Sequence, residues 1–145
     1  MSAISVEFHP HSYKEFFVDV LVNFPGLDEE ILRAFESYKT TGVATGRIGR
    51  DAPYVRPEAA FQAKLMHIHI KLPPGVFPPN LPQIDRVCRR GAPHRDAALV
   101  YVRGELEEHR YCLLAFLHPD GHAKAREEKL MRYLARLAKQ FRDEN

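Results

Sequence analysis

The 145-residue sequence predicts an α+β domain, an antiparallel sheet with helices packed on one face. Apolar residues make up 45% of the chain and charged residues 28%, which is typical of a folded globular protein. The stretch Leu65–Leu72 alternates apolar and polar side chains, as a strand does when only one sheet face is buried. The expected elements run strand, helices, three strands, helix, and this mixed order favours the α+β class. We expect a single domain, residues 1–145, because a chain of this length can bury a substantial core.

The first third of the chain predicts one strand and one helix. Phe16–Val22 is rich in β-branched and aromatic residues, which favour a strand. Asp28 is placed to cap a helix that runs to about Thr41, and Gly42 is a suitable stop. The Gly-, Arg- and Pro-rich stretch Val43–Pro57 is expected to be a connection.

The middle of the chain predicts the strand that carries the most distinctive polar residues. A short helix is expected at Glu58–Lys64, directly before the strand Leu65–Leu72. A proline-rich loop, Pro73–Pro82, and a basic segment, Arg86–Arg95, follow.

The last third predicts a hairpin and a long helix. The strands Ala98–Arg103 and Tyr111–Leu117 are separated by the short stretch Gly104–His109, which suits a hairpin. Asp120 is placed to cap the final helix. That helix has an apolar stripe at three- and four-residue spacing: Leu130, Leu134, Leu137 and Phe141.

The charge distribution leans toward the C-terminal half. Met1–Asn80 holds 8 Lys and Arg against 9 Asp and Glu, whereas Leu81–Asn145 holds 13 against 10. A modest basic face suits a protein that touches phosphates while another body supplies most of the binding energy. An ordinary solvated surface explains the same counts equally well.

Several classes of protein are disfavoured by what the sequence lacks. Cys88 and Cys112 are far apart, which does not suit a disulfide framework or a zinc knuckle. There is no phosphate-binding glycine loop, no Gly-x-Ser-x-Gly elbow and no carboxylate cluster of the two-metal kind. The most apolar early stretch, Phe16–Phe24, is interrupted by Asp19 and is too short to span a bilayer. We expect a cytoplasmic protein with no membrane partner.

The strongest local signal is His67-Ile68-His69 together with Lys71, which would lie in a row on one sheet face. Imidazoles titrate near neutral pH, so such a pair can share general base and general acid work. The same residues can also be an exposed strand face without a function. A third possibility is a metal site, which would need another ligand such as His122 or Asp120.

A second signal surrounds the start of the last predicted helix. His122 lies in the first turn, where the helix dipole favours a neutral imidazole, and Arg126 follows one turn later on the same face. A neutral histidine beside a fixed cation can deprotonate a hydroxyl while a phosphate is held. The alternative is an ordinary helix start with an exposed histidine.

Three further residues are candidates for contacts with phosphates or bases. Arg50 can bind a phosphate in a forked manner, or pair with the neighbouring Asp51. Tyr101 and Arg103 share one face of their strand, so they can stack on a base and hold its phosphate. Tyr101 can equally belong to the core.

An ordered set of motifs across residues 35–142 resembles the YafO family of type II toxins. The motifs are Phe35-x-x-Tyr38-Lys39-x-x-Gly42, Gly49-Arg50-Asp51-x-x-Tyr54, His67-Ile68-His69, Phe77-Pro78-Pro79, Leu99-Val100-Tyr101-x-x-Gly104, Pro119-Asp120-x-His122-x-x-Ala125-Arg126 and Phe141-Arg142. The resemblance implies a toxin that cuts messenger RNA on translating ribosomes and is neutralised by a cognate antitoxin. It also implies a RelE-like architecture and cleavage without metal or cofactor, in which the ribose 2′-hydroxyl attacks the adjacent phosphate.

The catalytic assignments rest on the residues themselves, because RelE-like active sites vary in residue identity. His67 or His69 would activate the 2′-hydroxyl or protonate the leaving oxygen, and His122 would take the complementary role. Lys71 and Arg126 would hold the phosphate, with Arg50, Tyr101 and Arg103 as further RNA contacts. The histidine face should then be at least partly open to solvent, with His122 about 10 Å or less from His67 or His69.

Two other functions remain open at this point. One is a non-catalytic protein that inhibits translation by occupying the ribosome. The other is a small metal-dependent enzyme built on His67, His69 and His122.

Overall fold

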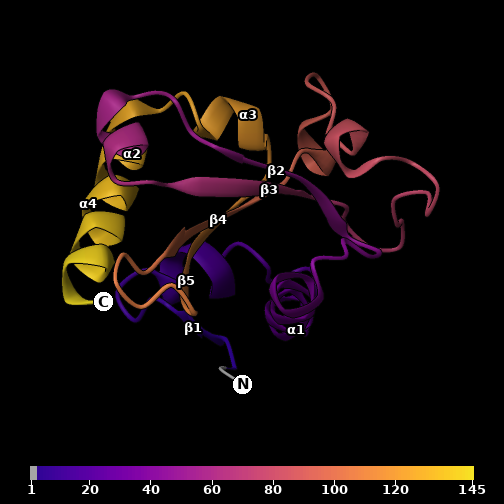
Figure 1. Cartoon of the computed structure of the whole chain (residues 1–145). Helices are drawn as coiled ribbons and strands as arrows, with labels where there is room; N and C mark the ends of the chain where they lie inside the picture. The colour runs from indigo at the N-terminus through magenta and orange to yellow at the C-terminus, as the bar shows by residue number, and fades with distance from the viewer. Residues whose placement is uncertain (1–2) are drawn as a thin grey trace.

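A five-stranded sheet forms the centre of the computed structural model, which describes residues 3–145 (Figure 1). The strands are β1 (Ser5–Phe8), β2 (Ile48–Pro53), β3 (Met66–Ile70), β4 (Ala98–Arg103) and β5 (Arg110–Leu117). Their order across the sheet is β1-β5-β4-β3-β2. Only β1 runs parallel to its neighbour, and the other three pairings are antiparallel. The predicted α+β class is confirmed.

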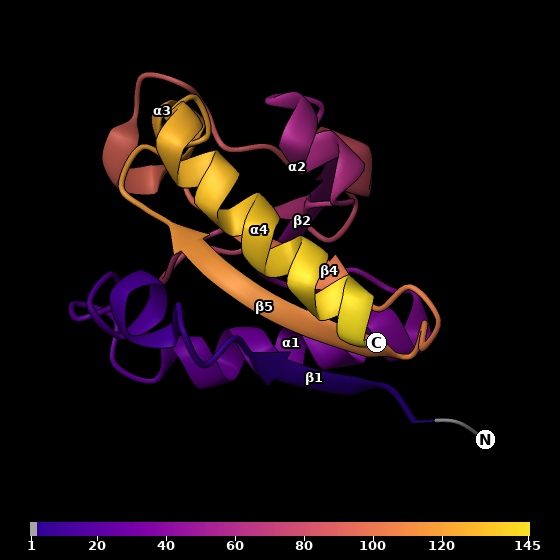
Figure 2. The same cartoon turned by 90° about the vertical axis from the view of Figure 1, so that its left-hand side faces the viewer.

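Helices lie on both faces of the sheet, rather than on one face as predicted (Figure 1). The helices are α1 (Leu27–Thr41), α2 (Glu58–Gln62), α3 (Gly121–Lys124) and α4 (Glu128–Glu144), with a π-helical turn η1 (Lys14–Val18) and two 3₁₀ turns, η2 (Gln83–Asp85) and η3 (Pro93–Arg95). α1 and η1 cover one face, and α2 and α4 cover the other; Figure 2 shows α4 lying along β5. None of these helices, in the part of the chain that is described, is long and apolar enough to cross a membrane.

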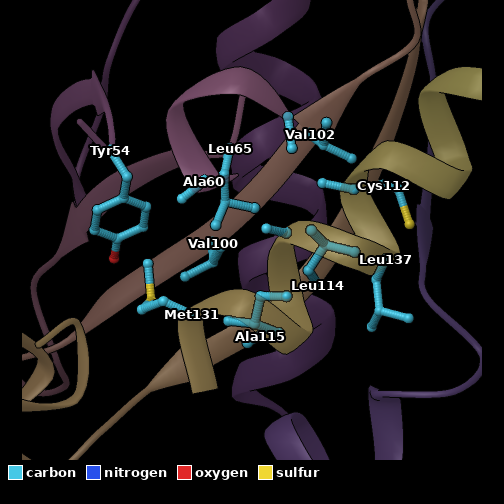
Figure 3. Packing of buried hydrophobic residues seen from close by; sticks show 14 of the residues in the cluster. Tyr54, Ala60, Leu65, Val100, Val102, Cys112, Leu114, Ala115, Met131 and Leu137 are labelled. Carbon is cyan, nitrogen blue, oxygen red and sulfur yellow. The ribbon is translucent and has the colours of Figure 1, made fainter. Parts of the chain in front are cut away.

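Two hydrophobic cores follow from this arrangement. The core beneath α2 and α4 contains Val100, Leu114, Met131 and Leu137, with Tyr54 at its edge (Figure 3). The core beneath α1 contains the opposite side chains of the same strands, such as Leu99 and Leu113, packed against Ile31 and Phe35. β4 and β5 are therefore apolar on both faces, the pattern of strands buried from both sides. The alternation in Leu65–Leu72 did not predict this, because β3 carries polar side chains on the face where β4 and β5 carry apolar ones.

Two predictions in the N-terminal third are wrong. Phe16–Val22 is not a strand: the chain there forms η1 and then turns, and Phe17 is fully buried against α1. The strand in this region is β1, which lies earlier in the chain. Val43–Pro57 is not only a connection, because it contains β2, which pairs with β3.

Helix ends differ from their predicted positions in two places. Gly26 occupies the N-cap of α1, while Asp28 lies in the first turn and accepts a hydrogen bond of 2.6 Å from the Tyr13 hydroxyl. The predicted end at Gly42 is confirmed, with a positive φ of 77°. The predicted C-terminal helix is two helices, α3 and α4, because the chain leaves helical geometry at Glu127, whose ψ is 99°.

Candidate active site

The three histidines singled out by the sequence surround one small pocket of about 40 Å³. β3 supplies His67 and His69, and α3 supplies His122. The imidazole centroids of His67 and His69 are 5.8 Å apart, and those of His69 and His122 are 5.5 Å apart. The expected separation of about 10 Å or less is therefore confirmed. The remaining lining residues are Tyr54, Asp96, Ala98, Gly121 and Ala125.

The alternation of β3 places both of its histidines on the face that α2 and α4 cover. His67 pairs with Val100 and His69 with Ala98 of β4, both on that face. The expected opening to solvent is limited: His67 is half-buried, and His69 is only 8% exposed. Both imidazoles line the pocket, so neither is sealed inside a hydrophobic core.

A tight turn at the start of α3 brings His122 to the same place. Asp120 adopts a left-handed conformation, φ 51°, and its carboxylate accepts the Ala123 N–H at 3.3 Å. The Gly121 N–H donates to the Asp96 carbonyl at 2.9 Å. A Cβ at Gly121 would lie 3.3 Å from that carbonyl oxygen, which is tighter than an ordinary contact. Glycine there allows α3 to approach the segment before β4 closely.

Asp96 is the partner of His122, and sequence reasoning missed it. One oxygen of its carboxylate, Oδ2, lies 2.7 Å from His122 Nδ1 and 2.9 Å from the His122 backbone nitrogen. The Asp96 side chain is 2% exposed and that of His122 is 22% exposed. A carboxylate on Nδ1 orients the ring, leaves Nε2 free to exchange a proton and stabilises the imidazolium. The available signal was an aspartate two residues before a buried strand, since a buried carboxylate needs partners.

His69 is held in one tautomer by the backbone. Its Nδ1 accepts the Cys88 N–H at 3.0 Å, so in the neutral ring the proton resides on Nε2. Burial, and next the nearby His122, lower the pKa of His69 to about 4. At neutral pH His69 is therefore an uncharged hydrogen-bond donor.

His67 is neutral for a similar reason. Its ring stacks on Tyr54, with centroids 4.0 Å apart and planes 12° from parallel. Burial, and next the neighbouring His69, lower the pKa of His67 to about 4. Its Nδ1 is buried and has no hydrogen-bond partner among residues 3–145. The ring packs between Tyr54 and His69 and shapes the wall of the pocket.

Three of the predicted phosphate-binding residues are exposed cations. They lie on β2, directly after β3 and just after α3. Arg50 on β2 is close enough for its charge to contribute to the lowered pKa of His69. Lys71 directly follows β3 and lines a second, larger hollow beside the pocket. Arg126 is exposed just after α3, rather than one turn along a continuous helix.

Tyr101 and Arg103 do not lie at the pocket. Tyr101 is 2% exposed on the opposite, α1-covered face, where its hydroxyl donates to Asp51 at 2.8 Å and accepts from Lys39 at 2.9 Å. A side chain so enclosed cannot stack on a base. Arg103 is at the hairpin end, where it donates to the Glu108 carbonyl. Their shared face is the wrong one because the polar face of β3 continues into the apolar Val100 and Val102 of β4.

The predicted alternative of a metal site lacks a suitable set of ligands among residues 3–145. Across residues 3–145 no three His, Cys, Asp or Glu side chains are grouped so as to hold an ion. Asp96 engages Nδ1 of His122, and the Cys88 N–H engages Nδ1 of His69.

Comparison with known proteins places these residues in a known family. Residues 36–143 match the family described as "Toxin YafO, type II toxin-antitoxin system". The chain is 35% identical over 112 residues to the "mRNA interferase toxin YafO" of Escherichia coli (strain K12), which covers 74% of this chain and 80% of that relative. No solved structure matches. The matched region contains every predicted site residue and excludes β1 and η1.

Proposed function

Since the chain belongs to the YafO family of type II toxin–antitoxin toxins, we propose that it is a ribosome-dependent endonuclease that cuts messenger RNA at the histidine pocket. The observation that carries this proposal is the pairing of His122 with the buried Asp96 beside two neutral imidazoles. In this arrangement His122 can accept a proton, and the uncharged His69 can donate a hydrogen bond, at the same pocket. RNA cleavage by internal attack requires both functions.

His122 is the general base in this proposal. Its Nε2 takes the proton of the ribose 2′-hydroxyl while the 2′-oxygen attacks the adjacent phosphorus. The bond from phosphorus to the 5′-oxygen breaks, which leaves a 2′,3′-cyclic phosphate and a 5′-hydroxyl that takes its proton from water. Asp96 stabilises the imidazolium that forms.

His69 has a different role from the acid–base partner that the sequence suggested. Because Cys88 fixes its proton on Nε2, His69 donates a hydrogen bond to a phosphate oxygen in the transition state. His67 positions His69 through ring contact. Arg50, Lys71 and Arg126 supply positive charge around the phosphate.

The family also indicates where the protein works and what restrains it. We propose that a cognate antitoxin neutralises it and that it acts in the cytoplasm, where messenger RNA and ribosomes meet. No metal or cofactor takes part in the proposed reaction.

The direct test is a cleavage assay with purified protein, messenger RNA and ribosomes. We expect cleavage only when ribosomes are present, at the same rate with and without EDTA, and products that end in a 2′,3′-cyclic phosphate. Translation inhibition without RNA cleavage would support a non-catalytic ribosome binder instead. Cleavage that EDTA abolishes, and Zn²⁺ restores, would support the metal-dependent alternative.

A further inference from the structure

The histidine pocket is too small to hold a nucleotide. Its volume of about 40 Å³ is several times smaller than the roughly 300–1,000 Å³ of clefts that bind drug-sized ligands. It is therefore too small to enclose a sugar or a base. The nucleotides on either side of the scissile phosphate must be held by a neighbouring surface.

A much larger hollow of about 930 Å³ lies beside the pocket, at the end of β3. This volume falls within the range of clefts that bind nucleotide-sized ligands. Lys71, Arg89 and Arg95 line it, together with the rings of Phe24 and His118. We call this surface the basic groove.

The basic groove is positively charged without compensation. No Asp or Glu is among the described residues that line it. Lys71, Arg89 and Arg95 are exposed, and none of the three forms an ion pair with a carboxylate in residues 3–145. Three unpaired cations at one surface attract a polyanion.

Neighbouring residues of the same two segments line the groove and the pocket. β3 contributes His69 to the pocket and leads to Lys71 in the groove, and the segment before β4 contributes Asp96 and Arg95 in the same way. Cys88 joins the two, because it lines the groove while its N–H binds His69. The pocket and the groove are therefore neighbours along both segments.

The groove also offers aromatic surface. The rings of Phe24 and His118 lie edge to face, with centroids 5.8 Å apart, and both are half-buried. Cations that follow a phosphate backbone, combined with rings on which bases stack, are the usual means of binding single-stranded nucleic acid.

We propose that the basic groove binds the single-stranded RNA adjacent to the phosphate that is cut. The inference rests on the proposed endonuclease function, since it places the scissile phosphate at the histidine pocket. Arg89 and Arg95 each contact one phosphate, and a base lies against Phe24. An acidic protein segment is disfavoured because the two segments that line the groove also carry His69 and Asp96 of the pocket, where the proposed function places a phosphodiester.

The test measures binding of a fluorescein-labelled, eight-nucleotide 2′-O-methyl RNA, which cannot be cleaved, as a function of salt. In the Arg89→Gln, Arg95→Gln double variant we expect the slope of log K against log salt to fall by about 1.4, since each lost single-strand phosphate contact removes about 0.7. Affinity at low salt should fall about tenfold or more. The control is Arg132→Gln, Arg136→Gln, which removes the same charge from exposed positions on α4 and should leave the slope unchanged.

Three results would overturn the proposal: equal effects of the two double variants, no RNA binding by the unmodified protein at low salt, or tighter binding of a poly-glutamate peptide than of RNA. The outcome is separable from that of the proposed function. RNA binding that depends on Arg89 and Arg95, in a protein that cuts no messenger RNA, supports the groove and refutes the endonuclease. Ribosome-dependent cleavage by a protein whose RNA binding ignores both arginines supports the endonuclease and refutes the groove.

Discussion

At the scale of single residues, the chemistry depends on which nitrogen of each imidazole carries its proton. The carboxylate of Asp96 and the backbone N–H of Cys88 decide this for His122 and His69. Both partners lie outside the motifs that drew attention to the histidines. The sequence could identify the three imidazoles, because His-x-His on a strand and a histidine after a capping aspartate are visible patterns. It could not identify their partners, which depend on how β3, β4 and α3 pack.

We predict that Asp96→Asn lowers the rate of RNA cleavage by about 10²–10⁴, the usual contribution of a general base. Oδ2 of Asp96 contacts both the His122 backbone N–H and Nδ1. An amide oxygen at that position lacks the charge that stabilises the imidazolium, and an NH₂ group there would donate to Nδ1, move the ring proton to Nε2 and leave the backbone N–H without its acceptor. Single-turnover cleavage on ribosomes measures this, with Asp19→Asn at an exposed position as the control. Full activity in a folded Asp96→Asn protein would rule out His122 as an oriented base.

Tyr101 is expected to stabilise the fold without touching RNA. Tyr101→Phe removes a hydroxyl bound to Asp51 and Lys39, and should lower the free energy of unfolding by about 1–3 kcal/mol. The cleavage rate should stay within about twofold of that of the unmodified protein, because Tyr101 is on the face opposite the pocket. Urea denaturation and cleavage assays test both parts. Unchanged stability with lost cleavage would return Tyr101 to the list of RNA contacts.

At the scale of elements, α3 is the short helix on which the site depends. The sequence showed its aspartate cap, but not its separation from α4, because the apolar stripe of α4 suggested one continuous helix. β2 was missed for a related reason. Its residues, Ile48–Pro53, include a glycine, a proline and two charges, and they form a strand through pairing with β3 rather than through intrinsic preference.

We predict that Asp120→Ala weakens catalysis, whereas Asp120→Asn restores it. Alanine removes the cap on Ala123 and disfavours the left-handed backbone, which should cost about 1–2 kcal/mol and displace His122. Asparagine caps helices equally well and tolerates that backbone conformation. Cleavage and thermal melting of the two variants should therefore diverge. If both variants lose activity alike, the carboxylate charge matters and the cap does not.

At the scale of the whole molecule, the two-sided burial of the sheet makes stability depend on pH. The lowered pKa values of His67 and His69, both about 4, mean that the folded protein holds these rings neutral, while the unfolded chain protonates them near pH 6.5. The unfolded state therefore binds more protons between pH 6.5 and pH 4. Stability is complete above that window and falls as the pH drops through it.

The expected loss of unfolding free energy is on the order of 2 kcal/mol between pH 6.5 and pH 5, allowing for partial solvent screening. Urea denaturation across this range measures it. The His67→Asn, His69→Asn double variant should show a flatter pH profile, whereas His109→Asn, at an exposed position, should not. A profile as steep in the double variant as in the unmodified protein would show that other groups titrate.

The general class of the fold could be predicted from the order of strands and helices, and the second covered face could not. The evidence for it was present in Ala98–Arg103 and Tyr111–Leu117, which are apolar without alternation, as strands buried on both sides are. β3, with its histidines, differs from β4 and β5 because its second face is polar. The pocket lies at this polar face, where His67 and His69 line it.

The most direct test of the account replaces His122 with alanine and measures messenger-RNA cleavage on ribosomes. We expect the rate to fall by about 10²–10⁴, while ribosome binding and the melting temperature stay close to those of the unmodified protein. His109→Ala, on the exposed hairpin, is the matched control and should cleave normally. Undiminished cleavage by a folded His122→Ala protein would contradict the central claim and place the chemistry outside the histidine pocket.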